Sequence, residues 1–153
     1  MTGATIHASA VLVGDRGILI RGPSGSGKSQ LALSLLQAAP FARLVGDDRI
    51  LLEAVHGRLL MRPAPALQGL IEIRGLGVRS VLFEPVAVAH LVVDLAAGDA
   101  ERLPEPAAVS TAIEEIALAR LAVAPGADAL NAVLGFLQYG EASAEPPNSL
   151  NRR

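Results

Sequence analysis

The chain has 153 residues, enough for one domain with a sizeable core but few for two independent domains. Its residues are 51% apolar and 3% aromatic and include no cysteine, so we expect an aliphatic core and exclude disulfides, thiolate nucleophiles and cysteine-bound metals. The formal net charge of −2 gives no general attraction to nucleic acid or to anionic lipid, so we expect neither as a partner.

Three features of the chain predict a cytoplasmic protein. The mean hydropathy is +0.43, yet charged residues interrupt every apolar stretch well before the roughly 20 residues that a membrane helix needs. Residues 1–7 lack the charged start and apolar run of a secretion signal. The absence of cysteine is typical of a reducing compartment.

The first elements along the chain are two strands, a glycine-rich loop and a helix. Residues 8–20 are rich in Val, Ile and Leu, and the Gly-Asp-Arg-Gly stretch in their middle predicts a hairpin turn. Residues 22–27 break this pattern, and apolar residues return at helical spacing in residues 28–39. Pro40 then ends the helix.

The loop matches the phosphate-binding pattern G-x-x-x-x-G-K-[ST], and it lies between a strand and a helix as that pattern requires. Its residues are Gly22, Pro23, Ser24, Gly25, Ser26, Gly27, Lys28 and Ser29. Glycines let backbone N–H groups surround phosphate oxygens, and the helix presents its positive end to them. Lys28, the only lysine in the chain, is predicted to reach the β- and γ-phosphates of ATP, and Ser29 to bind Mg²⁺.

Residues 43–52 predict a buried strand that carries Asp47 and Asp48 in its middle or at its end. P-loop folds commonly place a carboxylate that organises magnesium at the end of the strand that follows the loop helix. One of the two acids can hold the magnesium shell while the other accepts a proton from an incoming hydroxyl group. The alternative is a solvated acidic turn.

Residues 55–65 predict a hairpin followed by an irregular connection, and residues 69–78 predict a functional loop. This second segment contains Glu72, Arg74 and two glycines. Glu72 can complete a magnesium shell, and Arg74 can offset the charge of a transferring phosphoryl group. The alternative is a surface ion pair beside a glycine turn.

The remaining chain predicts one more strand and two helices. Residues 86–95 form the most continuous β-branched run and predict a central strand. Residues 111–122 and 127–137 have helical spacing, and we expect both helices to pack on the sheet. Residues 141–153 lose apolar content and predict a disordered tail, which leaves one domain over residues 1–140.

Three segments in this order resemble bacterial HPr kinase/phosphorylase: the P-loop, Leu-Val-Gly-Asp-Asp and Glu-Ile-Arg-Gly-Leu-Gly. The resemblance covers residues 6–128 and is closest over residues 22–78. It is to the short form of alphaproteobacterial type, which lacks the separate N-terminal domain. It implies a single α/β P-loop kinase domain with a central sheet and flanking helices, like the C-terminal domain of HPr kinase.

The resemblance also implies roles for particular residues. Asp48 matches the residue that accepts the proton of the substrate serine, and Glu72 matches the second magnesium contact. With Asp48 as the base, we expect Asp47 to be the acid of the pair that holds magnesium. Lys28 and Ser29 match the phosphate and magnesium positions. His7 and Arg102 match a catalytic histidine and a catalytic arginine. By itself, His7 would be read as a structural or surface histidine and Arg102 as a surface charge.

The activity that the resemblance implies is ATP- and magnesium-dependent phosphorylation of a serine on HPr or an HPr-like phosphocarrier protein. It also implies a homo-oligomer, in this family a hexamer. Residues 123–128 keep only the Pro-Gly pair of the dephosphorylation segment and none of its arginines, so we expect weak or no phosphorylase activity.

Two other functions use the same loop. One is a small-molecule kinase, which would need a lid or an acceptor pocket that 153 residues scarcely accommodate. The other is a regulatory protein that binds a nucleotide without transferring phosphate, against which the acidic Asp48 and Glu72 argue. Transfer of labelled phosphate to a protein serine separates the three hypotheses.

Overall fold

The structure is a computed structural model, and it describes residues 4–140. Its strands are β1 (Ala4–His7), β2 (Ser9–Val13), β3 (Arg16–Arg21), β4 (Ala42–Gly46), β5 (Arg49–Val55), β6 (Arg58–Pro63), β7 (Leu70–Ile73), β8 (Gly77–Ser80), β9 (Ala87–Asp94), β10 (Ser110–Ile113) and β11 (Ile116–Ala122). Its α-helices are α1 (Lys28–Ala38) and α2 (Ala129–Tyr139), and its short 3₁₀ helices are η1 (Pro65–Leu67) and η2 (Pro106–Val109). Neither α-helix of this part of the chain is long and apolar enough to cross a membrane.

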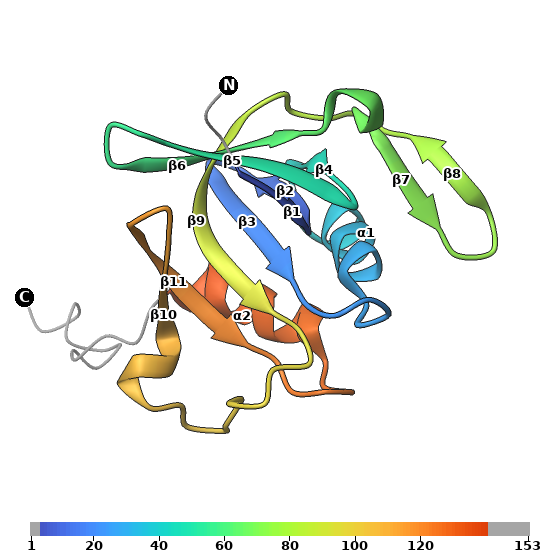
Figure 1. Cartoon of the computed structure of the whole chain (residues 1–153). Coiled ribbons are helices and arrows are strands. Elements are labelled where there is room, and N and C mark those ends of the chain that lie inside the picture. The colour runs from blue at the N-terminus through green and yellow to red at the C-terminus, as the bar shows by residue number, and fades with distance from the viewer. Residues whose placement is uncertain (1–3, 141–153) are drawn as a thin grey trace, which may run out of the picture.

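Nine of the strands form one sheet, in which β3 and β9 lie at the centre (Figure 1). The order is β1-β5-β6-β9-β3-β2-β4, and β11 pairs with β9 while β10 pairs with β11. Strand β9 runs parallel to both β3 and β11, with Arg21 opposite Asp94 at the end of β3. The carboxyl ends of three parallel strands therefore meet beside the loop that leaves β3.

Alternating side chains of the central strands pack into two cores. On the helix side, Ile20 and Val93 pack with Leu35 of α1 and Val133 of α2. On the other side, apolar residues of the central strands pack against β5 and β6: Ala10, Leu19, Val92, Leu52 and Met61. The helices thus cover one face of the sheet, and the β5–β6 ribbon crosses over the other (Figure 1).

Several sequence predictions are confirmed. The two strands and turn predicted over residues 8–20 are β2 and β3, and the helix predicted over residues 28–39 is α1. The central strand and the last helix are also present, as β9 and α2. The mixed α/β fold with a central sheet and flanking helices is therefore correct. The tail predicted over residues 141–153 lies outside the described residues.

The helix predicted over residues 111–122 is wrong. This segment is the β10–β11 hairpin, and its turn is Glu114-Glu115. Both glutamates have positive φ values, +50° and +65°, which suit a tight hairpin turn and end any helix. Strand β11 also pairs in parallel with β9. This pairing between distant segments favours a strand more than the helical spacing of the apolar residues favours a helix.

The single strand predicted over residues 43–52 is two strands, β4 and β5. The chain reverses at Asp47-Asp48, where Asp48 has φ +71°. Aspartate is among the residues that tolerate this left-handed conformation. The segment predicted as a functional loop over residues 69–78 is the β7–β8 hairpin beside α1 (Figure 1), and β1 is a strand that the sequence did not indicate.

Candidate active site

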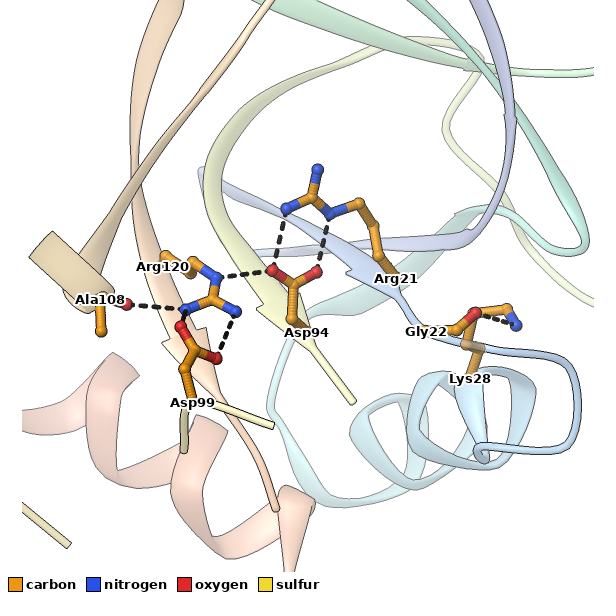
Figure 2. Close-up of polar contacts among 7 residues, drawn as sticks. All are labelled: Arg21, Gly22, Lys28, Asp94, Asp99, Ala108 and Arg120. Atoms are coloured by element: carbon orange, nitrogen blue, oxygen red, sulfur yellow. Dashed lines mark hydrogen bonds and ion pairs between the residues drawn. The ribbon is translucent and has the colours of Figure 1, made fainter. Parts of the chain in front are cut away.

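The phosphate loop joins the end of β3 to the start of α1. Gly25 and Gly27 have φ values of +81° and +98°, which favour glycine. Lys28 folds back over the loop, and its Nζ donates to the carbonyl oxygen of Gly22 at 2.8 Å (Figure 2). The same Nζ also donates to the carbonyl oxygen of Pro23 at 3.1 Å. The loop therefore combines the curvature, the helix start and the cation that a polyphosphate site uses.

Asp47 follows β4 and is buried, with 6% of its surface exposed. Its Oδ1 accepts hydrogen bonds from Ser29 Oγ at 2.7 Å and from Ser9 Oγ at 2.6 Å. Ser9 lies in β2 and is fully buried, and Ser29 lies in the first turn of α1. Because the proton of Ser29 is directed at Asp47, the lone pairs of the Ser29 oxygen stay available to a metal ion.

This set of donors fits magnesium. Mg²⁺ takes oxygen ligands and usually binds proteins through one or two side chains, with water and phosphate as the other ligands. Ser29 supplies a hydroxyl oxygen, and Asp47 supplies a buried negative charge in contact with it. Within residues 4–140 no group of three or more His, Cys, Asp or Glu side chains could hold a metal. A magnesium ion here would therefore take most of its ligands from phosphate and water.

Asp48, unlike the buried Asp47, leaves 71% of its side chain exposed. Its Oδ1 lies 3.9 Å from Nδ1 of His7, at the end of β1. The other ring nitrogen of His7, Nε2, is 3.2 Å from Nη2 of Arg49. A guanidinium group only donates, so in this contact Nε2 accepts and the ring proton is on Nδ1, facing Asp48. The two neighbouring acids thus have different surroundings.

The other candidate residues lie apart from this cluster. Glu72 lies on β7 and Arg74 in the turn after it, and both are exposed. Ile71 and Ile73 anchor the hairpin to the helix-side core, which places it next to α1. Among the described residues, no hydrogen bond or ion pair joins Glu72, Arg74 or the exposed Arg102 to the P-loop. Their functional roles stay predictions.

A third aspartate, Asp94 at the end of β9, lies on the other side of the P-loop strand and is held by two arginines (Figure 2). Arg21 donates to it through Nε at 2.8 Å and through Nη2 at 2.9 Å. Arg120 donates through Nε at 2.6 Å and extends to Asp99 at 2.8 Å and to the carbonyl of Ala108 at 3.0 Å. This arginine network ties β3, β9 and β11 together.

Hydrogen bonds within the arginine network shift the pKa values of Asp94, Asp99 and Arg120 toward their charged forms. Burial acts to raise the pKa of Asp94, but the hydrogen bonds from Arg21 and Arg120 outweigh it and hold that pKa below its ordinary value. The hydrogen bond from Arg120 likewise lowers the pKa of Asp99, and the pKa of Arg120 is raised by its bonds to Asp99 and Asp94. Both carboxylate oxygens of Asp94 already accept hydrogen bonds from arginine.

The sequence reasoning missed Ser9 and the arginine network. Ser9 is the hydroxyl residue in an otherwise apolar strand, which was a signal for a buried hydrogen bond. Asp94 ends the most continuous apolar run, next to the P-loop strand, and could have been considered as a magnesium carboxylate. Only the structure reveals that two arginines occupy it.

These features define a P-loop kinase domain. Two central strands run parallel, a phosphate loop joins a strand to a helix, and a carboxylate accepts a hydrogen bond from the serine of that loop. The family model described as "HPr Serine kinase C-terminal domain" matches residues 2–103. The chain therefore belongs to the HPr serine kinase C-terminal domain family.

Relatives with the same family name are similar over part of the chain. The "HPr kinase/phosphorylase" of Mycoplasma mycoides is 40% identical over 76 residues, which are 50% of this chain and 24% of that protein. A protein of that name from Streptococcus thermophilus is 42% identical over 79 residues, 51% of this chain and 25% of the relative. The matched segments thus span about a quarter of these relatives.

A solved structure has a similar fold. It is the "Hpr(Ser) kinase/phosphatase" of Coxiella burnetii. The superposition covers 89% of this chain and 89% of that chain, with a TM-score of 0.73. Its sequence identity is 23%, so the likeness concerns the fold.

Proposed function

We propose that this chain uses ATP and magnesium to phosphorylate a serine of HPr or of an HPr-like phosphocarrier protein. One observation carries the proposal: beside the phosphate loop, buried Asp47 binds Ser29 while the adjacent Asp48 is exposed and faces His7. A kinase needs both arrangements, one to hold a metal on the phosphates and one to take a proton from the acceptor. Family membership supports the same reaction.

In the proposed reaction the serine oxygen attacks the γ-phosphorus of ATP, and the bond from that phosphorus to the β,γ-bridging oxygen breaks to release ADP. Asp48 accepts the serine proton, and His7 stabilises its carboxylate from the Nδ1 side. Lys28 turns from the loop carbonyls to the β- and γ-phosphates. Magnesium, when bound, would offset phosphate charge, with Ser29 and Asp47 holding it.

The exposure of Asp48 supports a protein acceptor over a small molecule. A small metabolite is usually enclosed by its site, whereas a base with 71% of its side chain exposed can be reached by a serine on another protein. The pairing with His7 also supports a kinase over a nucleotide sensor, which would need no base. Glu72, Arg74 and Arg102 are proposed to complete the site from the β7–β8 hairpin and the loop after β9.

We further propose a cytoplasmic homo-oligomer, by analogy with the hexamers of the family. Leu76, Val78 and Leu82 leave 59%, 56% and 77% of their surface exposed in and after the β7–β8 hairpin, and such apolar surface commonly lies at interfaces. Light scattering on the purified chain measures the copy number, and a monomer at micromolar concentration would contradict this assembly.

The test uses ATP labelled on its γ-phosphate with three acceptors: HPr, HPr with its serines replaced by alanine, and a panel of small hydroxyl compounds. We expect label on a serine of HPr alone. Lys28→Ala should weaken ATP binding and abolish transfer, and Lys28→Arg should restore little because its charge is spread over a planar group. Wild-type ATP affinity in Lys28→Ala would contradict the site, and labelling of a small compound instead of HPr would contradict the acceptor. Adding inorganic phosphate to labelled HPr should release little pyrophosphate.

A further inference from the structure

His7 and Arg49 lie side by side at the edge of the main sheet. They are directly opposite partners in the antiparallel pair of β1 and β5, so their side chains are on the same face of these strands, and both are exposed. Opposite residues of such a pair have Cβ atoms about 4.5–5.5 Å apart, which is close enough for their side chains to interact. Nη2 of Arg49 accordingly lies 3.2 Å from Nε2 of His7.

The contact with Arg49 selects one of the two neutral forms of the His7 ring. A neutral imidazole carries its proton on Nδ1 or on Nε2, and the hydrogen bond that one nitrogen makes decides the state of the other. The guanidinium group of Arg49 can only donate, so Nε2 of His7 accepts and Nδ1 carries the proton. The tautomer of His7 is therefore set at the nitrogen opposite the one that faces Asp48.

The tautomer decides how His7 acts on Asp48. Nδ1 lies 3.9 Å from Oδ1 of Asp48, which is longer than a hydrogen bond. At this distance the sign of the electrostatic interaction depends on what the ring presents, because an N–H group attracts the carboxylate and a lone pair repels it. With its proton on Nδ1, His7 therefore keeps Oδ1 of Asp48 turned toward the ring and leaves Oδ2 to take a proton.

The backbone holds the acidic turn without help from the side chain of Arg49. The N–H of Ala8 donates to the carbonyl oxygen of Asp48 at 3.3 Å, and the N–H of Arg49 donates to that of Asp47 at 2.9 Å. The side chain of Arg49 is exposed, so its replacement opens no cavity in the core. A substitution at this position therefore tests the contact with the histidine rather than the fold.

We propose that Arg49 is a positioning residue for phosphoryl transfer: it holds His7 in the tautomer whose Nδ1–H group faces Asp48. The inference rests on the proposed function, because it takes Asp48 as the base that accepts the proton of the acceptor serine. It extends the pair of Asp48 and His7 to three residues, in which Arg49 acts on the base only through the histidine.

Nuclear magnetic resonance tests the tautomer directly and without substrate, on protein whose histidines carry the heavy nitrogen isotope. Long-range proton–nitrogen spectra distinguish the two tautomers, and we expect His7 to be protonated on Nδ1 at about pH 8, where histidine is ordinarily neutral. Arg49→Met removes the donor and should move the proton at least in part to Nε2, whereas Arg49→Lys, which also only donates, should keep it on Nδ1. His56, in the β5–β6 turn, is the internal reference and should not change. A wild-type tautomer in Arg49→Met would overturn the inference.

Kinetics test the consequence for transfer. Single-turnover labelling of HPr should fall about five- to tenfold in Arg49→Met, as expected for the loss of one hydrogen bond, and should recover in Arg49→Lys. ATP and magnesium should bind to both variants within about twofold of wild type. The matched control is Arg58→Met, which changes an exposed arginine at the far end of the β5–β6 hairpin and should transfer as wild type does.

A double-mutant cycle separates this role from a direct one. If Arg49 acts through His7, Arg49→Met should cost nothing further in a chain that already carries His7→Ala. Additive losses would show that Arg49 acts on the phosphates or the acceptor itself and would overturn the inference. A wild-type chain that labels no HPr would instead overturn the proposed function, and the role of Arg49 in transfer with it, even where the spectra show the expected tautomer.

Discussion

Asp47 and Asp94 lie on either side of the strand that leads into the phosphate loop, and they differ in the donors around them. Within residues 4–140, the carboxylate of Asp47 accepts hydrogen bonds only from hydroxyl groups, those of Ser9 and Ser29. Asp94 accepts from two arginines, and both of its oxygens are engaged. A hydroxyl donor leaves the charge of a carboxylate uncompensated, whereas the two guanidinium groups, one of them shared with Asp99, compensate the charge of Asp94.

This difference separates the two carboxylates by role. A metal ion is attracted to uncompensated negative charge, so Asp47 is suited to organise magnesium and Asp94 is not. Asp94 instead connects the ends of three parallel strands, and the carbonyl of neighbouring Arg21 accepts from Leu95 at 2.9 Å. Position in the fold alone would have favoured Asp94, which ends the strand next to the loop strand, so the surroundings of each carboxylate decide its role.

The largest expected effect is a loss of transfer rate, and it comes from Asp48, the neighbour of Asp47. Asp48→Asn keeps the shape and removes the base, and general-base help is typically worth about 10²- to 10⁴-fold in rate. Single-turnover labelling of HPr should fall by that factor, while ATP and magnesium bind within several-fold of wild type. Asp15→Asn, in the exposed β2–β3 turn, is the control. A larger rate loss in Asp47→Asn, with binding intact, would reverse the roles of the two neighbouring acids.

Asp47→Asn should act on magnesium. Removing the charge that Ser29 contacts weakens the metal site, and outer-shell changes of this kind typically cost about 10- to 100-fold in metal affinity. The magnesium concentration for half-maximal labelling should rise by that factor, and the rate at saturating magnesium should recover in large part. Asp94→Asn is the comparison, because we expect its magnesium requirement to be unchanged. If the magnesium concentration for half-maximal labelling rises as much in Asp94→Asn as in Asp47→Asn, the two carboxylates do not differ in their role toward magnesium.

Local sequence predicted the parts of the site that consecutive residues carry. The P-loop from Gly22 to Ser29 is one segment, and its glycines and its helix start were readable without knowledge of the fold. The acidic pair was found for the same reason, because two charged residues interrupt an apolar run. The burial of Asp47 and the exposure of Asp48 could not be predicted from the sequence, since they depend on a chain reversal at a positive φ.

Contacts between distant segments could not be predicted. Ser9 meets Asp47 across 38 positions of sequence and Arg21 meets Asp94 across 73, and both contacts depend on which strands become neighbours. Strand β11 pairs with the edge of β9 and β10 pairs with β11, and this pairing decided between strand and helix. Helical spacing within a short alanine-rich segment carries no information about such an edge.

The third effect should be on stability rather than on activity. Asp94→Asn leaves Arg21 and Arg120 without their common anion, and for a carboxylate with 17% of its side chain exposed we expect a loss of about 1 to 2 kcal/mol in the free energy of unfolding. Urea unfolding measures it, with Asp99→Asn as the more exposed control, for which a smaller loss is expected. An equal loss in both variants would contradict a special role of Asp94.

The difference in unfolding free energy between wild type and Asp94→Asn should depend on pH. The pKa of Asp94 is lower in the folded chain than the ordinary value of about 3.9, so the unfolded chain takes up the proton first as the pH falls. The contribution of Asp94 is therefore fully present above about pH 5 and is lost as the pH falls through the folded pKa. The stability difference between wild type and Asp94→Asn should be constant near neutral pH and shrink below about pH 4. A difference that grows in acid would contradict the sign of the shift.

The smallest expected effect tests whether Ser9 acts through Asp47. Ser9 touches neither substrate nor metal in the proposed site, so it is a positioning residue, and Ser9→Ala removes one of the two hydroxyl donors on Asp47 Oδ1. Loss of one hydrogen bond is worth about 1 kcal/mol, so the magnesium concentration for half-maximal labelling should rise roughly fivefold, with little change in the rate at saturating magnesium. Ser9→Thr keeps the hydroxyl group and should restore the wild-type requirement. If Ser9 has a purely structural role, Ser9→Ala should lower the free energy of unfolding and leave the magnesium dependence unchanged. That outcome would limit the magnesium site to Asp47 and Ser29.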